Sequence, residues 1–145
     1  FKIWEKNIMI EEFNGVFYLI IFLILFVGFI FYGYQTLIGT AKFIEKYNID
    51  QSGAFMVRFI GTFIAAFALI QLYIFFDGIE GHWAFFLFGL LQSIIAVVAN
   101  FITVELSDYK TNKNEKITKE GYVAPLVFTV LWLVLIYGVQ DKIYI

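Results

Sequence analysis

The 145-residue sequence contains no cysteine and a single histidine, His82. The absence of cysteine excludes disulfides, thiolate metal ligands, cysteine nucleophiles and c-type haem attachment within this chain. One histidine is too few for bis-histidine haem or for a metal site built from several histidines. Because no catalytic motif occurs either, the sequence predicts a protein that is not an enzyme and that holds no cofactor.

Charge is also scarce in this chain. Charged residues make up 15% of it and the net charge is −2, so it has no basic surface of the kind that binds nucleic acid. The longest polar segment, residues 105–121, is too short to form a soluble catalytic domain. We therefore expect no nucleic-acid partner and little mass outside a membrane.

Apolar residues, in contrast, are abundant, at 61% of the chain with a mean hydropathy of +0.83. Ordinary soluble domains are about half apolar and about a quarter charged. Four apolar stretches together contain a single charged residue, Arg58. The length of each is close to that of a transmembrane helix, which needs about 20 residues to cross a bilayer. These stretches are Val16–Leu37, Ala54–Phe76, Trp83–Val104 and Tyr122–Val139. The sequence predicts an all-α, multi-pass integral membrane protein, with residues 1–145 forming one four-helix bundle.

The segments outside these spans give an orientation and a possible fifth element. Apolar residues alternate with charged ones before Gly15, which predicts an interfacial amphipathic helix over residues 2–13, with a frayed tail as the alternative. Linkers 38–53 and 105–121, together with Arg58, carry seven of the ten basic residues, and the opposite side carries three. The positive-inside rule then predicts cytoplasmic linkers and termini outside.

Polar residues within the spans are the candidate site. The short turn Asp77–His82 predicts that spans two and three form an antiparallel hairpin, which brings Arg58 and Glu105 to the same membrane face. Asn100 and Gln35 could join them in a polar intramembrane cluster. Such a cluster would bind a headgroup, a quinone or a proton, because polar groups in lipid need a partner. In the alternative, Arg58 reaches lipid phosphates and Glu105 is solvated.

Two further groups of residues have a structural and a functional interpretation. Gln71 and Gln92 are predicted to form an interhelical amide pair, a bond that stabilises a bundle by about 0.6 to 2 kcal/mol. Asp77, Glu80 and His82 in the outer turn are competent metal ligands, although polar residues are also ordinary in such a turn. Because polar residues are expected in such a turn without any ligand, the sequence predicts no metal site there.

Small residues recur at helical spacing in the two central spans. Gly61, Ala65 and Ala68 share a face of span two, and Gly89 and Ala96 belong to a similar stripe in span three. Stripes of this kind allow a second helix to approach closely. They suggest contacts with neighbouring membrane helices.

The segment from Tyr32 to Phe76 resembles a known family. An aromatic helix end (YGYQTLIG) is followed by a short amphipathic linker (AKFIEKYNIDQSG) and by a helix that carries an arginine and then a glycine (FMVRFIGTFIAAFALIQLY). This arrangement is similar to the first helical hairpin of the small DoxX-like four-helix membrane proteins, a superfamily that includes the ergosterol-biosynthesis scaffold type. The resemblance implies a compact four-helix bundle, in some members a scaffold, and it assigns no functional residue.

These observations leave three functions open. The leading hypothesis is a non-enzymatic accessory or scaffold subunit of a larger membrane complex, which contacts other subunits or copies of itself within the lipid bilayer. The first alternative is a lipid- or quinone-binding membrane module. The second is a small oligomeric transporter or channel, which would need several copies because four unbroken spans offer little room for a pathway.

Overall fold

The computed structural model describes residues 6–145, and the part of the predicted interfacial helix before Lys6 lies outside them. Between Lys6 and Ile145 the regular secondary structure is helical, apart from one isolated bridge between Lys110 and Lys116, so the all-α prediction is confirmed. The elements are α1 (Lys6–Glu12), α2 (Val16–Leu37), α3 (Thr40–Lys46), the 3₁₀ turn η1 (Gln51–Gly53), α4 (Ala54–Asp77), α5 (Trp83–Phe101), the π-helical turn η2 (Ile102–Leu106) and α6 (Glu120–Ile143).

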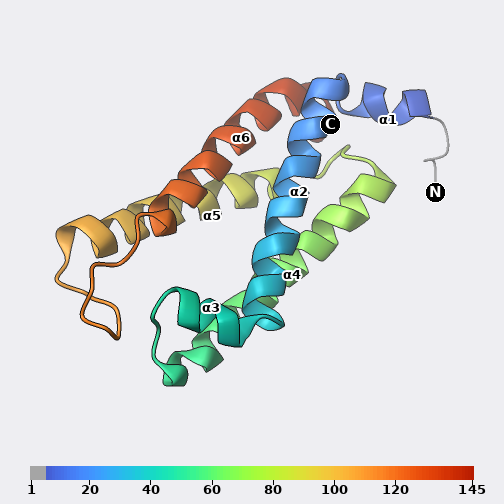
Figure 1. Ribbon diagram of the computed structural model, residues 1–145. Helices are drawn as coiled ribbons and strands as arrows, with labels where there is room; N and C mark the ends of the chain where they lie inside the picture. The colour runs from blue at the N-terminus through green and yellow to red at the C-terminus, as the bar shows by residue number, and fades with distance from the viewer. Residues whose placement is uncertain (1–5) are drawn as a thin grey trace.

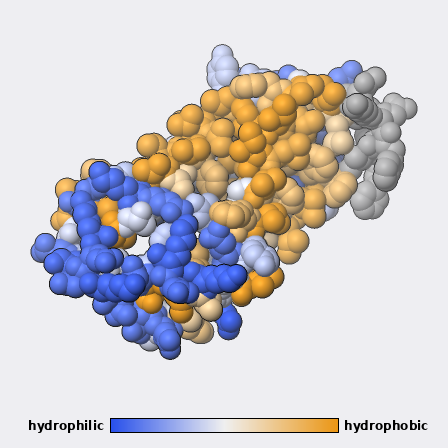
Figure 2. All heavy atoms as spheres, in the orientation of Figure 1, coloured by the Kyte–Doolittle hydropathy of each residue, from blue (hydrophilic) through white to orange (hydrophobic). Residues whose placement is uncertain are grey.

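Four of these helical segments are long and apolar enough to cross a membrane, which supports a multi-pass integral membrane protein. Figure 2 shows the corresponding apolar surface in the middle of the molecule and a hydrophilic surface gathered at one end. The last helix, α6, begins two residues before the predicted span and ends four residues after it. A helix can continue past the apolar stretch because its backbone hydrogen bonds are made within the helix.

The helices are arranged as two packed pairs, α2 with α4 and α5 with α6, and the pairs meet along α2 and α6. Both pairs converge near the turn between α4 and α5, and they diverge towards the two long linkers (Figure 1). The prediction that spans two and three pack as a hairpin is therefore corrected. Although a short turn joins α4 to α5, their main packing partners are α2 and α6.

Glycines bring the paired helices close together. A Cβ on Gly61 of α4 would lie 2.5 Å from the Thr36 hydroxyl of α2, and one on Gly89 of α5 would lie 2.5 Å from the Trp132 ring of α6. Gly33 of α2 likewise faces the backbone of Ala65 in α4. The small-residue stripes predicted from the sequence are thus used for packing within the chain.

An aromatic core lies where the two pairs meet. Trp132 of α6 is fully buried, with its ring centroid 6.4 Å from that of Phe29 in α2 and 6.1 Å from that of Phe67 in α4. The rings of Phe85 and Phe86 in α5 lie 6.0 and 5.9 Å from it. One indole thereby contacts rings on each of the other three long helices, within the centroid range of favourable aromatic pairs.

The converged end is closed by α1 and the turn that follows it. Phe13 is buried against Phe22, and the Glu12 carboxylate accepts a hydrogen bond from the backbone N–H of Ile79. The Asn14 side chain donates to the Gly138 carbonyl and to the Asp141 carboxylate at the end of α6. These contacts hold the first helix, the α4–α5 turn and the C-terminal helix together at the end opposite the long linkers.

Candidate functional site

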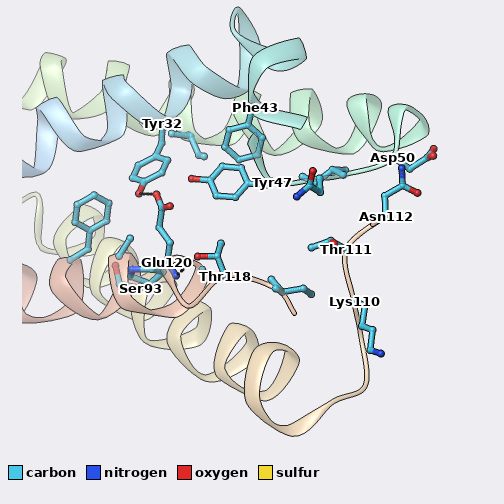
Figure 3. Close-up of a pocket in the computed structure, with 18 of the residues that line it drawn as sticks. Tyr32, Phe43, Tyr47, Asp50, Ser93, Lys110, Thr111, Asn112, Thr118 and Glu120 are labelled. Atoms are coloured by element: carbon cyan, nitrogen blue, oxygen red, sulfur yellow. Dashed lines mark hydrogen bonds between the residues drawn. The ribbon is translucent and has the colours of Figure 1, made fainter. Parts of the chain in front are cut away.

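The divergence of the helix pairs creates a cavity of about 680 Å³, which we call the wedge cavity (Figure 3). Its walls come from all four long helices and from both long linkers. The helices α2 and α6 stay in contact beside it through Gly28 and Phe128. On the α4 and α5 side, Phe67 contacts Phe85 and Phe88, with ring centroids 4.4 and 5.6 Å apart. The cavity opens beyond these rings, towards the linkers.

The inner part of the wedge cavity is apolar. Phe29, Ile64 and Phe128 line it, and the rings of Phe29 and Phe128 lie 5.3 Å apart. Behind Phe29 is Trp132, so the inner wall of the cavity is continuous with the aromatic core. Chain-like or ring-like apolar groups fit such a wall, because ligand pockets are predominantly apolar with a few placed polar groups.

A polar rim stands at the wider end of the wedge cavity. Figure 3 shows Tyr32 of α2, Tyr47 after α3 and Glu120 of α6 turned towards one another across the gap between the helix pairs. The Tyr32 hydroxyl donates to Glu120 Oε1 at 3.4 Å, and Lys46 Nζ lies 3.6 Å from Glu120 Oε2. Lys46 also donates to the Tyr47 hydroxyl at 2.9 Å. This rim offers one carboxylate and two phenols to a bound molecule.

Two side chains of the rim that lie outside the membrane-spanning segments, Tyr47 and Lys46, have shifted pKa values. Burial raises the pKa of the Tyr47 phenol; the hydrogen bond from Lys46 opposes this shift and Glu120 adds to it. The same hydrogen bond raises the pKa of Lys46. At neutral pH the rim therefore holds a protonated phenol at Tyr47 and a charged ammonium at Lys46.

The two linkers are joined to each other across the outer end of the wedge cavity. The backbone N–H of Asn112 donates to the Asn48 carbonyl at 2.9 Å, and the Asn48 side chain donates to Glu115 Oε2 at 3.3 Å. Asn48 and Asn114 both have positive φ, at 51° and 61°, a conformation that asparagine tolerates better than most residues. Tight turns at these two asparagines let the linkers fold back over the cavity.

The predicted cluster of Arg58, Glu105, Asn100 and Gln35 is not assembled in the structure. Arg58 is exposed and its Nε donates to the Thr40 hydroxyl at 3.1 Å, whereas Glu105 accepts from Lys116 at 2.7 Å. The reason is the divergence of the helix pairs, which separates the start of α4 from the end of α5. Gln35 is half-buried in α2 and lies outside both of these hydrogen bonds.

Asn100 has a structural partner instead. Pro125 lies inside α6 and lacks an N–H, so the carbonyl of Gly121 loses its usual helical hydrogen bond. The Asn100 side chain donates to this carbonyl at 2.6 Å. A polar side chain within a membrane helix thus satisfies a backbone group that the proline leaves free.

The predicted amide pair of Gln71 and Gln92 is not formed either. Gln71 is fully buried and its Nε2 donates to the Phe22 carbonyl at 3.0 Å, which ties α4 to its actual packing partner α2. Gln92 is exposed and belongs to the wall of the wedge cavity. The pair depended on a packed α4–α5 hairpin, and these two helices diverge.

In the turn Asp77–His82 the candidate metal ligands do not come together. His82 Nε2 lies 3.5 Å from an Asp77 oxygen, and Glu80 is exposed. Across residues 6–145 no three acidic, histidine or cysteine side chains come together in a way that could hold a metal ion.

Sequence reasoning missed the polar rim. Tyr32, Tyr47 and Glu120 are not among the candidate site residues predicted from the sequence. The available signal was the position of an acidic residue two residues before an apolar span, together with aromatic residues at the end of another span. Which of these residues meet depends on helix pairing, which the sequence pattern does not contain.

Comparisons of the chain with protein-family models, with curated proteins and with solved structures found no match. The resemblance of Tyr32–Phe76 to the DoxX-like proteins therefore stays a prediction. The fold and the site by themselves define a class: a helical protein with four candidate membrane spans and a cavity between two helix pairs.

Proposed function

We propose that the protein is a small membrane module that binds a lipid- or quinone-like molecule in the wedge cavity. The observation that carries this proposal is a cavity of about 680 Å³ with an apolar inner wall and a polar rim at one end of the spanning helices. Its volume lies within the about 300 to 1,000 Å³ of typical ligand pockets. Its polarity matches an amphipathic molecule whose apolar part points into the membrane and whose polar head lies at the interface.

The position of the cavity favours a ligand that comes from the bilayer. The linkers cross its outer end through the hydrogen bonds of Asn48, whereas α4 and α5 diverge beside it. A lipophilic molecule dissolved in the membrane can pass between two diverging helices without crossing water. Gln92 of α5, which belongs to the cavity wall, is exposed.

The accessory-subunit hypothesis has less support from the geometry. It drew on small-residue stripes as contact surfaces, and Gly61 and Gly89 already pack against α2 and α6. The exposed apolar side chains that remain are what any bilayer-embedded helix presents to lipid. We therefore put ligand binding first and keep subunit association as an outcome that the following experiment can detect.

Native mass spectrometry of the protein extracted in mild detergent tests the proposal. Ala124 is half-buried in the cavity wall, so Ala124→Phe should fill the space, whereas Ala66→Phe adds the same ring to an exposed position on α4. We expect the parent chain and Ala66→Phe to carry an extra lipid- or quinone-sized mass and Ala124→Phe to lose it. An extra mass that Ala124→Phe retains, or none on the parent chain, would rule out binding in the cavity. Other polypeptides in the complex would instead support an accessory subunit.

We also propose that the wedge cavity faces the cytoplasm, with the termini on the other side. The support is the excess of basic residues in the two linkers that meet over the cavity. Since the chain has no cysteine, Lys113→Cys in the third linker and Glu80→Cys in the outer turn each introduce a unique thiol. In intact cells a membrane-impermeant maleimide should label Glu80→Cys and should label Lys113→Cys only after permeabilisation. The reverse pattern would refute this orientation.

A further inference from the structure

We infer that the ligand of the wedge cavity carries an uncharged head that donates a hydrogen bond to Glu120, as the hydroxyl of a neutral lipid does. This inference rests on the proposed function, and it specifies the chemical class of the molecule bound.

The Glu120 carboxylate has free capacity to accept hydrogen bonds. Its contacts to the Tyr32 hydroxyl and to Lys46 Nζ are 3.4 and 3.6 Å long. Both are longer than usual donor–acceptor distances, which are about 2.5 to 3.0 Å for O–H···O and about 2.7 to 3.2 Å for N–H···O hydrogen bonds. A carboxylate offers about four acceptor positions, and among residues 6–145 the groups next to Glu120 are Tyr32, Lys46 and the Tyr47 phenol. Acceptor positions therefore remain for a molecule in the wedge cavity that Glu120 lines.

Glu105 is the other carboxylate that lies on a spanning helix near the long linkers, and its oxygens already accept short hydrogen bonds. Lys116 donates to one of its oxygens at 2.7 Å, and the Tyr122 hydroxyl donates to the other at 3.0 Å. Lys119 approaches the second oxygen at 3.9 Å. The contrast identifies Glu120 as the group that a ligand head would meet.

The charges around the cavity disfavour an anionic head. Two carboxylates, Asp50 and Glu120, and one lysine, Lys110, line the cavity, and the Lys46 ammonium beside Glu120 balances the remaining charge. A phosphate at the rim would add an unpaired negative charge next to the Glu120 carboxylate. The first turn of α6, where backbone N–H groups could otherwise attract an anion, already carries Glu120. The negative charges of the phosphate and of the Glu120 carboxylate would repel each other, and the repulsion increases where solvent is partly excluded.

A cationic head is disfavoured for a different reason. The Lys46 ammonium already lies beside Glu120, donates to the Tyr47 hydroxyl and sits 4.7 Å from the centre of the Tyr47 ring. A second ammonium, such as that of an ethanolamine lipid, would compete with Lys46 for the same partners. The head that suits the remaining acceptors is therefore neutral and carries a hydroxyl.

Two kinds of membrane molecule share this chemistry, the neutral glycerides and the quinols. We would measure binding of radiolabelled dioleoylglycerol to the full chain in detergent and compete it with its 3-O-methyl ether and with dioleoylphosphatidic acid. We expect the ether, which has no donor, and the phosphatidic acid each to compete about tenfold more weakly than dioleoylglycerol. A second series compares decylubiquinol with decylubiquinone, which has only acceptors in its head.

The variants connect these differences to Glu120. Glu120→Gln replaces a charged acceptor by a neutral one and should weaken dioleoylglycerol binding about tenfold. Glu45→Gln, at an exposed position of α3, should leave it unchanged. The comparison of the ligand analogues on the parent chain does not depend on whether Glu120→Gln folds.

The outcomes separate this inference from the proposed function. Tighter binding of decylubiquinol than of decylubiquinone, lost in Glu120→Gln, would support the inference with a quinol as the source. Equal binding of dioleoylglycerol and its ether, or tighter binding of phosphatidic acid, would overturn it. If neither the glycerides nor the quinols bind as expected, but the parent chain carries a co-purified ligand that Ala124→Phe loses, the inference about the head group is overturned. Binding in the cavity is then still supported. If Ala124→Phe binds every probe normally, the proposed function itself fails.

Discussion

Replacing Trp132 with alanine should destabilise the fold by about 3 kcal/mol, the lower end of the range for removing a buried large aromatic side chain. The indole is fully buried and contacts Phe29, Phe67 and Phe86, one ring on each of the other long helices. We place the cost at the lower end because lipid is as apolar as the core, so most of the loss comes from packing. The midpoint of thermal unfolding in detergent measures it.

Two variants serve as controls for this substitution. Leu133→Ala, at the next position of α6, is exposed and should change the midpoint little. Trp132→Phe keeps an aromatic ring and removes an indole N–H that has no hydrogen-bond partner among residues 6–145, so it should cost less than Trp132→Ala. Equal destabilisation by Trp132→Ala and Leu133→Ala would show that Trp132 does not organise the core.

Gly89→Ala should destabilise the α5–α6 pair by about 1 to 3 kcal/mol through overpacking. The added Cβ would lie 2.5 and 2.6 Å from two atoms of the Trp132 ring. That ring is enclosed by Phe85 and Phe86, so it cannot move aside without disturbing the aromatic core. The readout is unfolding in detergent, and the expected result is a lower midpoint with retained helical content.

Gly121→Ala is the matched control for this prediction. An added Cβ at Gly121 meets no atom within 4 Å, and the residue lies in the first turn of α6. Alanine loses less conformational freedom than glycine in a helix, so this variant should be neutral or stabilised by up to about 1 kcal/mol. If Gly89→Ala behaved like Gly121→Ala, the close contact of α5 and α6 would be refuted.

The presence of four long helices could be predicted because a bilayer-length apolar run is a one-dimensional property of the sequence. Helix pairing could not. The short turn at Asp77–His82 suggested an α4–α5 hairpin, but connection does not determine which helix faces pack. The contacts of Gly61 with Thr36 and of Gly89 with Trp132 select α2–α4 and α5–α6 instead.

The predicted polar cluster and the wedge cavity lie at the same end of the molecule but involve different residues. Arg58 and Glu105 stood out as the charges in or next to apolar runs, yet both have partners outside the wedge cavity. Tyr32, Tyr47 and Glu120 line the cavity because the α2–α4 and α5–α6 pairs diverge towards the linkers and place these side chains on opposite sides of the gap (Figure 3). Such a meeting of three distant positions follows from the crossing of helices and leaves no periodic signal in the sequence.

The most direct test of ligand binding in the wedge cavity is photo-cross-linking with a diazirine-bearing neutral lipid in bilayer nanodiscs, followed by mapping of the adducts by mass spectrometry. We expect the adducts to concentrate on cavity-lining residues such as Ser93 and Phe128, to saturate at low lipid fraction, and to disappear in Ala124→Phe. Adducts spread evenly over exposed positions such as Leu69 and Leu133, rising in proportion to the lipid added and unchanged in Ala124→Phe, would contradict a binding cavity.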